Sequence, residues 1–554
     1  MQIVQKWLAQ KANQSVLFLL LGGLLFRGII AWWLYPGFDE TYYYLYSINL
    51  DWSYFDHPVL VALTTGLGPW LTGEVTQFTI RLGTLILHTG SLGFLYLASA
   101  KLFSTKAARL TLAIATIIPM FQIGFGVLTL PDNPLIFFWS ASLYCAACEF
   151  FPQPSPQEYN LSESDRAQPS TSYRPSYRLT ILSILIGLAC LGKYHGFLLG
   201  FGLICFCLTS PRHRRALLSP WTGLGLGLFF VTIFPILFWN IQHDWVSFRF
   251  QLKRGVPREG YNLLSVVGVF LAHIAYLFPT LGLPLWWVSL RSALTQITPL
   301  FSKKSLIYRG DFKEKQLLIL WVSLPLMLGF TLMGGYQQIL PTWPMPGFWG
   351  VTLLLGQQAV IWQQQSRRGV RRWLKGSGIV IGTSLLLALL HITTGTLQKS
   401  SQYALLGGFV SPDDDPSTEL IDIQQLRRGF ADSPVLSKAL QNSSFIFTNG
   451  YYLGGPIGMA LTPLFHTPIT CFGEDMRGFA FWSRADQWVG KDGLYVTLKR
   501  FHRKKDLTAH YRTYFSSLER IGKVPIRRGG EIIEVIYVYQ GKTLLKPYPR
   551  PYGI

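Results

Sequence analysis

Eleven runs of apolar residues, separated by polar or charged segments, constrain the fold of this chain more than any other feature. A helix rises about 1.5 Å per residue and the hydrocarbon core of a bilayer is about 30 Å thick, so roughly 20 apolar residues can cross it. Hydrophobic residues make up 49% of the 554 residues and charged residues only 14%. The sequence therefore predicts a polytopic α-helical membrane protein with about eleven transmembrane helices, at 16–34, 77–100, 110–128, 132–150, 179–192, 195–209, 217–239, 262–290, 316–334, 344–363 and 377–396.

Lys and Arg residues are distributed unevenly over the loops between these runs. With the N-terminus inside, the predicted cytoplasmic segments contain 22 Lys and Arg residues and the segments on the opposite side contain 5. Because short basic loops stay on the cytoplasmic side, we expect the segment from 397 onward to be extracytoplasmic. The basic stretch at 503–505 lies in that segment, so the formal net charge of +21 does not indicate a nucleic-acid partner.

The last part of the chain has a different pattern from the apolar runs. Short β-rich runs at 445–448, 468–472, 494–498 and 532–539 alternate with stretches of helical character at 420–440 and 508–520. Such an alternation is typical of a small α/β fold. We therefore predict a membrane domain over 1–396 and a soluble extracytoplasmic α/β domain over 397–554.

Ionisable residues gather in the loops predicted to lie on the outer face. The first outer loop, 35–76, contains Asp39 and Glu40 directly after a span and has no Lys or Arg. Asp132 opens the fourth span, and Lys193 lies in the turn between two short spans. A later outer loop contains Arg254 and Arg258. A partly shielded carboxylate can act as a general base, and the basic groups can hold an anionic phosphate. The alternatives are a solvated acidic loop and basic side chains that reach lipid headgroups.

Six short motifs, taken in order, resemble the bacterial members of glycosyltransferase family 39, which are relatives of the protein O-mannosyltransferases. They also resemble the lipid A aminoarabinose transferases. The motifs are Phe38-Asp39-Glu40-Thr41-Tyr42-Tyr43, Phe55-Asp56-His57-Pro58, Arg81-Leu82, Leu130-Pro131-Asp132, Gly192-Lys193-Tyr194 and the segment from Trp239 to Phe248. The resemblance covers most of 20–350 and extends only loosely to the C-terminal part.

This resemblance implies a GT-C fold in the bacterial inner (plasma) membrane. It also implies transfer of a sugar, with inversion, from a polyprenyl-phosphate carrier to a lipid, glycan or protein acceptor outside. By position, Asp39 would be the base, Glu40 its support and Asp132 the alternative base. Lys193, helped by Arg254 or Arg258, would meet the carrier phosphate.

The resemblance also bears on a metal and on the sugar. Asp56 and His243 match a pair that holds a metal in the aminoarabinose transferases, so a divalent metal is an optional cofactor here. His57 stands where those transferases have lysine, which favours the family 39 side.

A second class of function is a non-catalytic lipid-linked sugar transporter or flippase. Transporters of this kind show repeated halves and charges near the middle of the bilayer. Here the ionisable residues gather at one face, which favours the enzyme.

Overall fold

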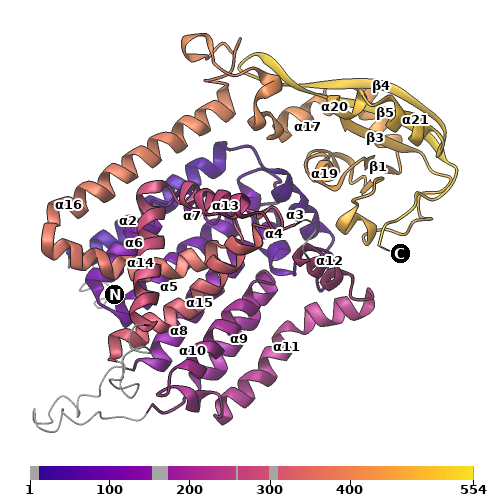
Figure 1. The fold of residues 1–554 in the computed structure, drawn as a ribbon. Helices are drawn as coiled ribbons and strands as arrows, with labels where there is room; N and C mark the ends of the chain where they lie inside the picture. Colours follow the sequence, from indigo (N-terminus) through magenta and orange to yellow (C-terminus); the bar gives the residue numbers. More distant parts are fainter. Residues whose placement is uncertain (1–10, 153–172, 257–259, 298–309, 553–554) are drawn as a thin grey trace, which may run out of the picture.

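The computed structural model of the protein describes residues 11–152, 173–256, 260–297 and 310–552. Its helices up to α16 form one bundle, and a smaller body containing a five-stranded sheet lies against one end of that bundle (Figure 1). We call residues 397–552 the tail and the end of the bundle that faces it the tail side.

The bundle and its connecting segments are built almost entirely from helices. They are α2 (Lys11–Trp33), α3 (Phe38–Ile48), α4 (Leu60–Thr72), η1 (Thr79–Arg81), α5 (Leu82–Leu102), α6 (Thr105–Ala115), α7 (Pro119–Ile123), α8 (Asp132–Phe150), α9 (Arg178–Gly192), α10 (Gly196–Thr209), η4 (Arg214–Ala216), α11 (Pro220–Gln242), α12 (Val246–Gly255), α13 (Leu263–Tyr276), α14 (Pro279–Ile297), α15 (Asp311–Met333) and α16 (Met345–Thr394).

Several of these helices are long and apolar enough to span a membrane, but the predicted count of eleven is not confirmed. Within the described residues five qualify, in α2, in η1 with α5, and in α11, α15 and α16. A sixth results if α13 and α14, which meet at 118°, form one broken span. The apolar helices α4, α9 and α10 are shorter. The coarser prediction, a mostly helical protein with several helices long and apolar enough to cross a membrane, is confirmed.

Three predicted spans differ from the structure for local reasons. The run 110–128 is divided between α6 and the five-residue α7. Pro119 disfavours a helical conformation at the residue before it, and Ile118 is extended with ψ 119°. The runs 344–363 and 377–396 both lie within α16, whose 50 residues are two helices that meet without a loop at a kink at Ser366 (φ −152°, ψ 93°), in the polar segment between the runs. The second half of α16 rises to the tail in Figure 1.

The tail contains a mixed sheet with strand order β2-β1-β3-β5-β4. Strands β2, β1 and β3 are parallel, whereas β5 is antiparallel to both β3 and β4. The elements beyond η6–η8 (405–419) are α17 (Ile423–Ala431), α18 (Pro434–Asn442), β1 (Phe445–Thr448), α19 (Tyr451–Phe465), β2 (Ile469–Cys471), η9 (Arg477–Ala480), β3 (Gly493–Leu498), α20 (Lys499–His502), α21 (Lys505–Arg512), β4 (Phe515–Arg528) and β5 (Glu531–Leu544).

Four of these strands lie where the sequence predicted short β-rich runs, but the stretch predicted as helical over 508–520 is helical only as far as Arg512. Helix α21 ends at Arg512, and β4 begins at Phe515. Along β4, buried Val524, Ile526 and Arg528 alternate with exposed residues, which is the period of a half-buried strand. The long hairpin with β5 stabilises β4 through contacts that a local helical pattern does not reveal.

The tail shares its hydrophobic core with the first outer loop. Buried side chains of α3 and α4, among them Tyr42, Leu45 and Val61, belong to the same cluster as those of α17, α19 and the sheet. At Gly455 of α19 a side chain would meet the backbone nitrogen of Tyr42 at 2.6 Å, so only glycine allows the two helices to approach this closely. The tail is therefore held directly against the segment that contains Asp39.

Candidate functional site

The first outer loop folds back on the bundle as α3 and α4, and this fold fixes where its carboxylates lie. Helix α3 begins after Gly37, whose N–H donates to Glu40 Oε2 at 3.0 Å. Asp39 and Glu40 thus occupy the first turn, where the free N–H groups of a helix favour negative charge. The two adjacent acids nevertheless have different surroundings.

Glu40 is a buried structural anchor, and its predicted support of Asp39 as a base stays a prediction. It is 1% exposed and receives two hydrogen bonds from the Arg81 guanidinium, each 2.7 Å long. The backbone N–H of Thr129 donates to the same carboxylate at 3.0 Å. Arg81 also donates to the carbonyls of Ala31 and Leu34 at the end of α2. Glu40 therefore joins α2, α3 and α5 and holds the first turn of α3 in place.

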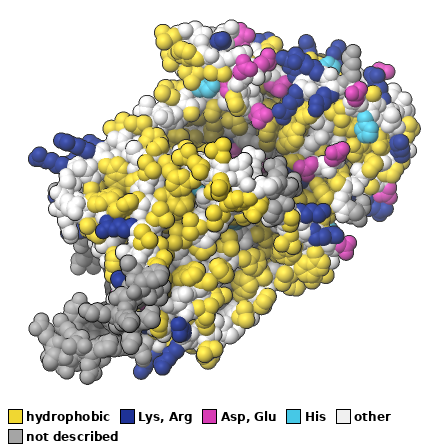
Figure 2. Space-filling view, viewed as in Figure 1, with side chains coloured by type: hydrophobic (Ala, Val, Ile, Leu, Met, Phe, Trp, Pro, Cys, Tyr) yellow, Lys and Arg dark blue, Asp and Glu magenta, His cyan; other side chains and the backbone are white. Residues whose placement is uncertain are grey.

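Asp39 is the acidic residue of the predicted site whose carboxylate has no hydrogen bond or ion pair among the described residues. Its side chain is exposed, although protein surrounds it on most sides, as expected for a group that lines a hollow. Figure 2 shows such a hollow between the tail and the helices beneath it. Burial raises the pKa of the Asp39 carboxyl above its ordinary value, and the charge of Arg477 opposes that rise. Asp39 is thus an unpaired carboxylate with increased basicity.

Asp56 pairs with an arginine that comes from the tail. It is fully buried, and Arg477 NH1 lies 3.1 Å from its Oδ2. The hydroxyl of Tyr46 donates to Asp56 Oδ1. The Arg477 guanidinium also lies over the Tyr451 ring, 3.7 Å from its centroid, which adds a cation–π contact. The tail therefore contributes a charged group to the site.

The surroundings of Asp56 and His243 do not fit the predicted metal pair. The Asp56 carboxylate already has a cation and a hydroxyl donor. His243 stacks on Trp239 with ring centroids 4.1 Å apart, and its Nδ1 lies 2.8 Å from the Trp239 carbonyl oxygen. Over the residues that the structure describes, no group of three or more His, Cys, Asp or Glu side chains could hold a metal ion. No step of the chemistry below is routed through a metal.

Lys193 and Asp132 form a buried ion pair. Lys193 follows α9 and Asp132 begins α8, so both lie at the tail side of the bundle. Lys193 Nζ is 2.9 Å from each Asp132 oxygen, and the two side chains are 6% and 3% exposed. Each charge is therefore neutralised by the other. The predicted roles of Lys193 toward a phosphate and of Asp132 as alternative base stay predictions.

Arg254 is the predicted phosphate ligand that keeps a free charge. Two consecutive residues with positive φ, Asp244 (49°) and Trp245 (58°), turn the chain from α11 into α12, which carries Arg254. Its guanidinium lies about 5 Å from the rings of Phe250 and Trp343 and makes no hydrogen bond or ion pair within the described part of the chain. Arg254 is close enough to Asp39 to influence the carboxyl's pKa. Arg258 lies outside the described residues.

Two histidines, His57 and His195, lie among these charged groups. We call the whole set the charged cluster: Asp39, Asp56, Asp132, Lys193, Arg254, Arg477, His57 and His195. Burial lowers the pKa of His57 and His195 well below the ordinary value, and the charge of Lys193 lowers it further. Both are neutral at neutral pH. His57 Nδ1 and His195 Nε2 are buried without a hydrogen-bond partner in the described structure. In a neutral imidazole each of these nitrogens can donate or accept one hydrogen bond, depending on the tautomer.

Sequence reasoning predicted Asp39, Asp56, Asp132, Lys193 and Arg254, and the structure brings these five into the charged cluster. It missed Arg477, which is separated from Asp56 by 421 positions. The composition of the first outer loop gave one signal for such a residue: the loop contains acids but no Lys or Arg, so any cation that pairs with these acids must come from elsewhere in the chain.

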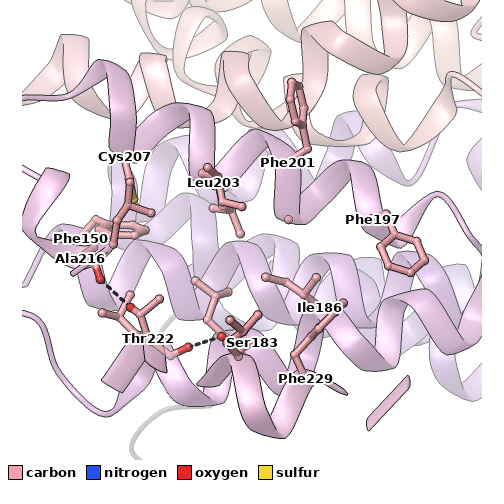
Figure 3. Close-up of a pocket in the computed structure, with 16 residues that line it drawn as sticks. Phe150, Ser183, Ile186, Phe197, Phe201, Leu203, Cys207, Ala216, Thr222 and Phe229 are labelled. Carbon is pink, nitrogen blue, oxygen red and sulfur yellow. Dashed lines mark hydrogen bonds between the residues drawn. The ribbon is translucent and has the colours of Figure 1, made fainter. Parts of the chain in front are cut away.

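An apolar groove lies beneath the cluster, between α9, α10 and α11. It has a volume of about 330 Å³, and Figure 3 shows Phe197 near one end and Phe150 near the other. The hydroxyl of Ser183 donates to the Leu179 carbonyl at 3.0 Å and that of Thr222 to the Ala216 carbonyl at 2.5 Å, so both are used internally. Phe197 is four residues beyond Lys193, and the groove therefore begins just below the cluster.

Comparison with known proteins finds likenesses to membrane glycosyltransferases. The family model described as dolichyl-phosphate-mannose-protein mannosyltransferase matches residues 56–150 and 171–239. Lipid A galacturonosyltransferase RgtD of Rhizobium johnstonii is 22% identical over 318 residues, which are 57% of this chain and 59% of the relative. The match thus spans less than two thirds of that relative's length.

Solved structures show the same fold. The crystal structure of ArnT from Cupriavidus metallidurans in the apo state matches with a TM-score of 0.58 at 14% identity, over 96% of this chain and 98% of that one. ArnT bound to undecaprenyl phosphate matches with a TM-score of 0.56 at 14% identity, over 94% and 97%. The resemblance predicted from the sequence is therefore confirmed: the chain is similar to GT-C membrane glycosyltransferases related to the lipid A aminoarabinose transferases.

Proposed function

We propose that this protein is an integral-membrane glycosyltransferase that moves a sugar, with inversion, from a polyprenyl-phosphate carrier to an acceptor on the tail side. The observation that carries the proposal is Asp39, a carboxylate without a hydrogen bond or ion pair among the described residues, whose pKa is raised by burial and lowered by the charges of Arg477 and Arg254. Asp39 and Arg254 lie at the end of the helix bundle where a lipid carrier presents its headgroup. The likeness to the lipid A galacturonosyltransferase RgtD supports a glycolipid acceptor, and the likeness to the protein mannosyltransferase family leaves a protein acceptor open.

Asp39 would act as the general base. It takes the proton from the acceptor hydroxyl as that oxygen bonds to the anomeric carbon of the donor sugar. The raised pKa of Asp39 increases its affinity for this proton. Attack opposite the phosphate inverts the anomeric carbon, and Asp39 later releases the proton to water.

The cations of the charged cluster would stabilise the leaving group, which is the polyprenyl phosphate. As the bond between the anomeric carbon and the phosphate oxygen breaks, its electron pair stays on the phosphate. A cation stabilises this developing charge most when the cation is fixed in place and has no other ionic partner. Arg254, which is unpaired within the described residues, is therefore favoured over Lys193, which is paired with Asp132. His57 Nδ1 and His195 Nε2 supply further polar contacts in their neutral forms.

The direct test is transfer in vitro. Purified protein in nanodiscs is given polyprenyl-phosphate sugars that carry arabinose, galacturonic acid or mannose, together with a lipid A acceptor or an acceptor peptide. Mass spectrometry should find the glycosylated acceptor and the free polyprenyl phosphate in equal amounts. Movement of intact donor across the bilayer without product would support the transporter instead.

The carrier chain is expected to lie in the apolar groove of Figure 3. At Gly200 an added Cβ would already approach Ile186 Cγ2 at 3.3 Å, so Gly200→Phe should fill the groove. We expect this change to weaken binding of a long-chain donor about tenfold, equivalent to roughly 1.4 kcal/mol. Gly227→Phe is the control, because a Cβ at Gly227 meets nothing within 4 Å. Equal losses for long-chain and two-isoprene donors would contradict the assignment.

The predicted orientation can be tested by labelling. We expect a membrane-impermeant maleimide to reach Asp432→Cys in intact cells and to miss Ser305→Cys until the cells are permeabilised. The basis is the split of 22 against 5 basic residues between the two sets of loops. Labelling at 305 in intact cells would invert the topology and place the charged cluster on the cytoplasmic side.

A further inference from the structure

The tail contains a polar pocket beside the charged cluster that the proposed transfer step does not use. Its volume is about 440 Å³. One wall comes from the segment that links α16 to α17, and the opposite wall comes from α20 and the end of β3. Phe38, the residue before Asp39, forms part of the lining. The pocket therefore lies directly next to the first turn of α3.

The two walls carry opposite charges. Asp413, Asp414 and Glu419 line the linker wall. Lys499, Arg500 and Arg503 line the wall formed by α20 and the residue that follows it. Figure 2 shows acidic and basic side chains close together on the tail above the hollow.

The ion pairs between these walls are open to replacement by a ligand. Arg500 NH1 lies 3.1 Å from Glu419 Oε1, with the side chains 46% and 53% exposed. Lys499 Nζ lies 3.8 Å from Asp413 Oδ1, and Arg503 has no ion pair among the described residues. Exposed pairs of this kind contribute little to stability, so a bound molecule can take over their hydrogen bonds at little cost.

We propose that this pocket binds the carbohydrate part of the acceptor. Sugar hydroxyls are both donors and acceptors, so they can bond the carboxylates of one wall and the guanidinium groups of the other. One aromatic ring, that of Phe38, lines the pocket, and it packs edge-on against Tyr452 at 5.8 Å. Such a ring offers a surface to the apolar face of a sugar. The inference rests on the proposed function.

The charge balance favours neutral sugar hydroxyls over a phosphate group. Besides the three acids of the linker wall, Glu534 and the buried Asp415 also line the pocket. Asp415 is paired with Arg528 at 2.5 Å, which leaves four acids against three bases around the free volume. A phosphate here would face more carboxylates than cations.

The position of the pocket also suits an acceptor. A glycan bound there would contact Phe38, which directly precedes Asp39 in α3. The proposed donor phosphate lies at Arg254. The tail would then hold the acceptor, and the bundle would hold the donor. Arg477, which the tail inserts beside Asp56, connects the two parts.

The test measures binding without turnover. Full-length protein in nanodiscs is studied by saturation-transfer NMR with the di-N-acetylated β-1,6-linked glucosamine disaccharide, which is neutral, and with its bisphosphorylated form. We expect the neutral disaccharide to bind, and Arg500→Gln and Glu419→Gln each to weaken its binding at least tenfold. Arg484→Gln is the matched control, because Arg484 is also an exposed tail arginine paired with an acid, Asp486 at 2.8 Å.

Three results would overturn the proposal: no signal from the neutral disaccharide, wild-type affinity in both pocket variants, or a preference above tenfold for the bisphosphorylated form. The last would identify an anion site. Because no sugar is transferred in this measurement, its outcome is independent of the assay for the proposed function.

Discussion

Replacing Asp39 with Asn should lower the rate of sugar transfer by ~10²–10⁴-fold, the usual contribution of a general base. Asparagine keeps the size and hydrogen-bonding shape of the side chain but cannot accept the acceptor's proton. Asp39 has no ion pair among the described residues, so its loss leaves no buried charge unpaired. Single-turnover transfer from the purified donor, with insertion and thermal unfolding measured in parallel, checks the prediction.

Glu74→Gln provides the matched control, because Glu74 is an exposed acid of the same outer loop with no side-chain partner in the described structure. It should transfer at the wild-type rate. If Asp39→Asn also transferred near that rate, the base would have to be another group, and Asp132 would be the next to examine.

The pH dependence follows from the same residue. Asp39 acts as a base only when unprotonated, and its pKa is raised by burial, so kcat/KM should fall as the pH drops through that raised value. Arg477 opposes the rise. Arg477→Gln should therefore move the acid limb to higher pH, whereas Arg477→Lys should leave it nearly unchanged. A purely structural role for Arg477 would lower the rate without moving this limb.

The positions predicted from sequence are those that a local pattern can identify. Asp39 and Glu40 follow a span directly, and Lys193 lies in a turn between two apolar runs, so hydropathy alone places them at one membrane face. Partners distant in sequence were not predictable in this way. Arg81 joins Glu40 and Arg477 joins Asp56 only once α3 folds back beneath the tail.

The number of spans could not be predicted from hydropathy for a similar reason. Hydropathy detects apolar runs, but it does not report whether the backbone continues straight through them. Pro119 interrupts one run, and the 118° bend between α13 and α14 divides another. In α16 the two runs lie on either side of a kink at Ser366, and the polar residues around that kink stay helical instead of forming a loop.

The pairing of Lys193 with Asp132 leads to the second large effect. Lys193→Met removes one charge and leaves the Asp132 carboxylate buried without its cation. Breaking a buried pair in this way typically costs about 3–5 kcal/mol. We expect a large loss of thermal stability in detergent, and Lys253→Met, which alters an exposed lysine of α12, should show none.

The double variant Lys193→Met with Asp132→Leu separates stability from function. Replacing both charges with apolar groups of similar size is often neutral or stabilising, so most of the lost stability should return. Donor binding by the refolded double variant then reports on the predicted phosphate contact. If it matches wild type, the pair serves the fold and Arg254 holds the phosphate; if it falls tenfold or more, Lys193 also meets the donor. A single Lys193→Met variant as stable as wild type would show instead that the buried pair contributes nothing to the folded state.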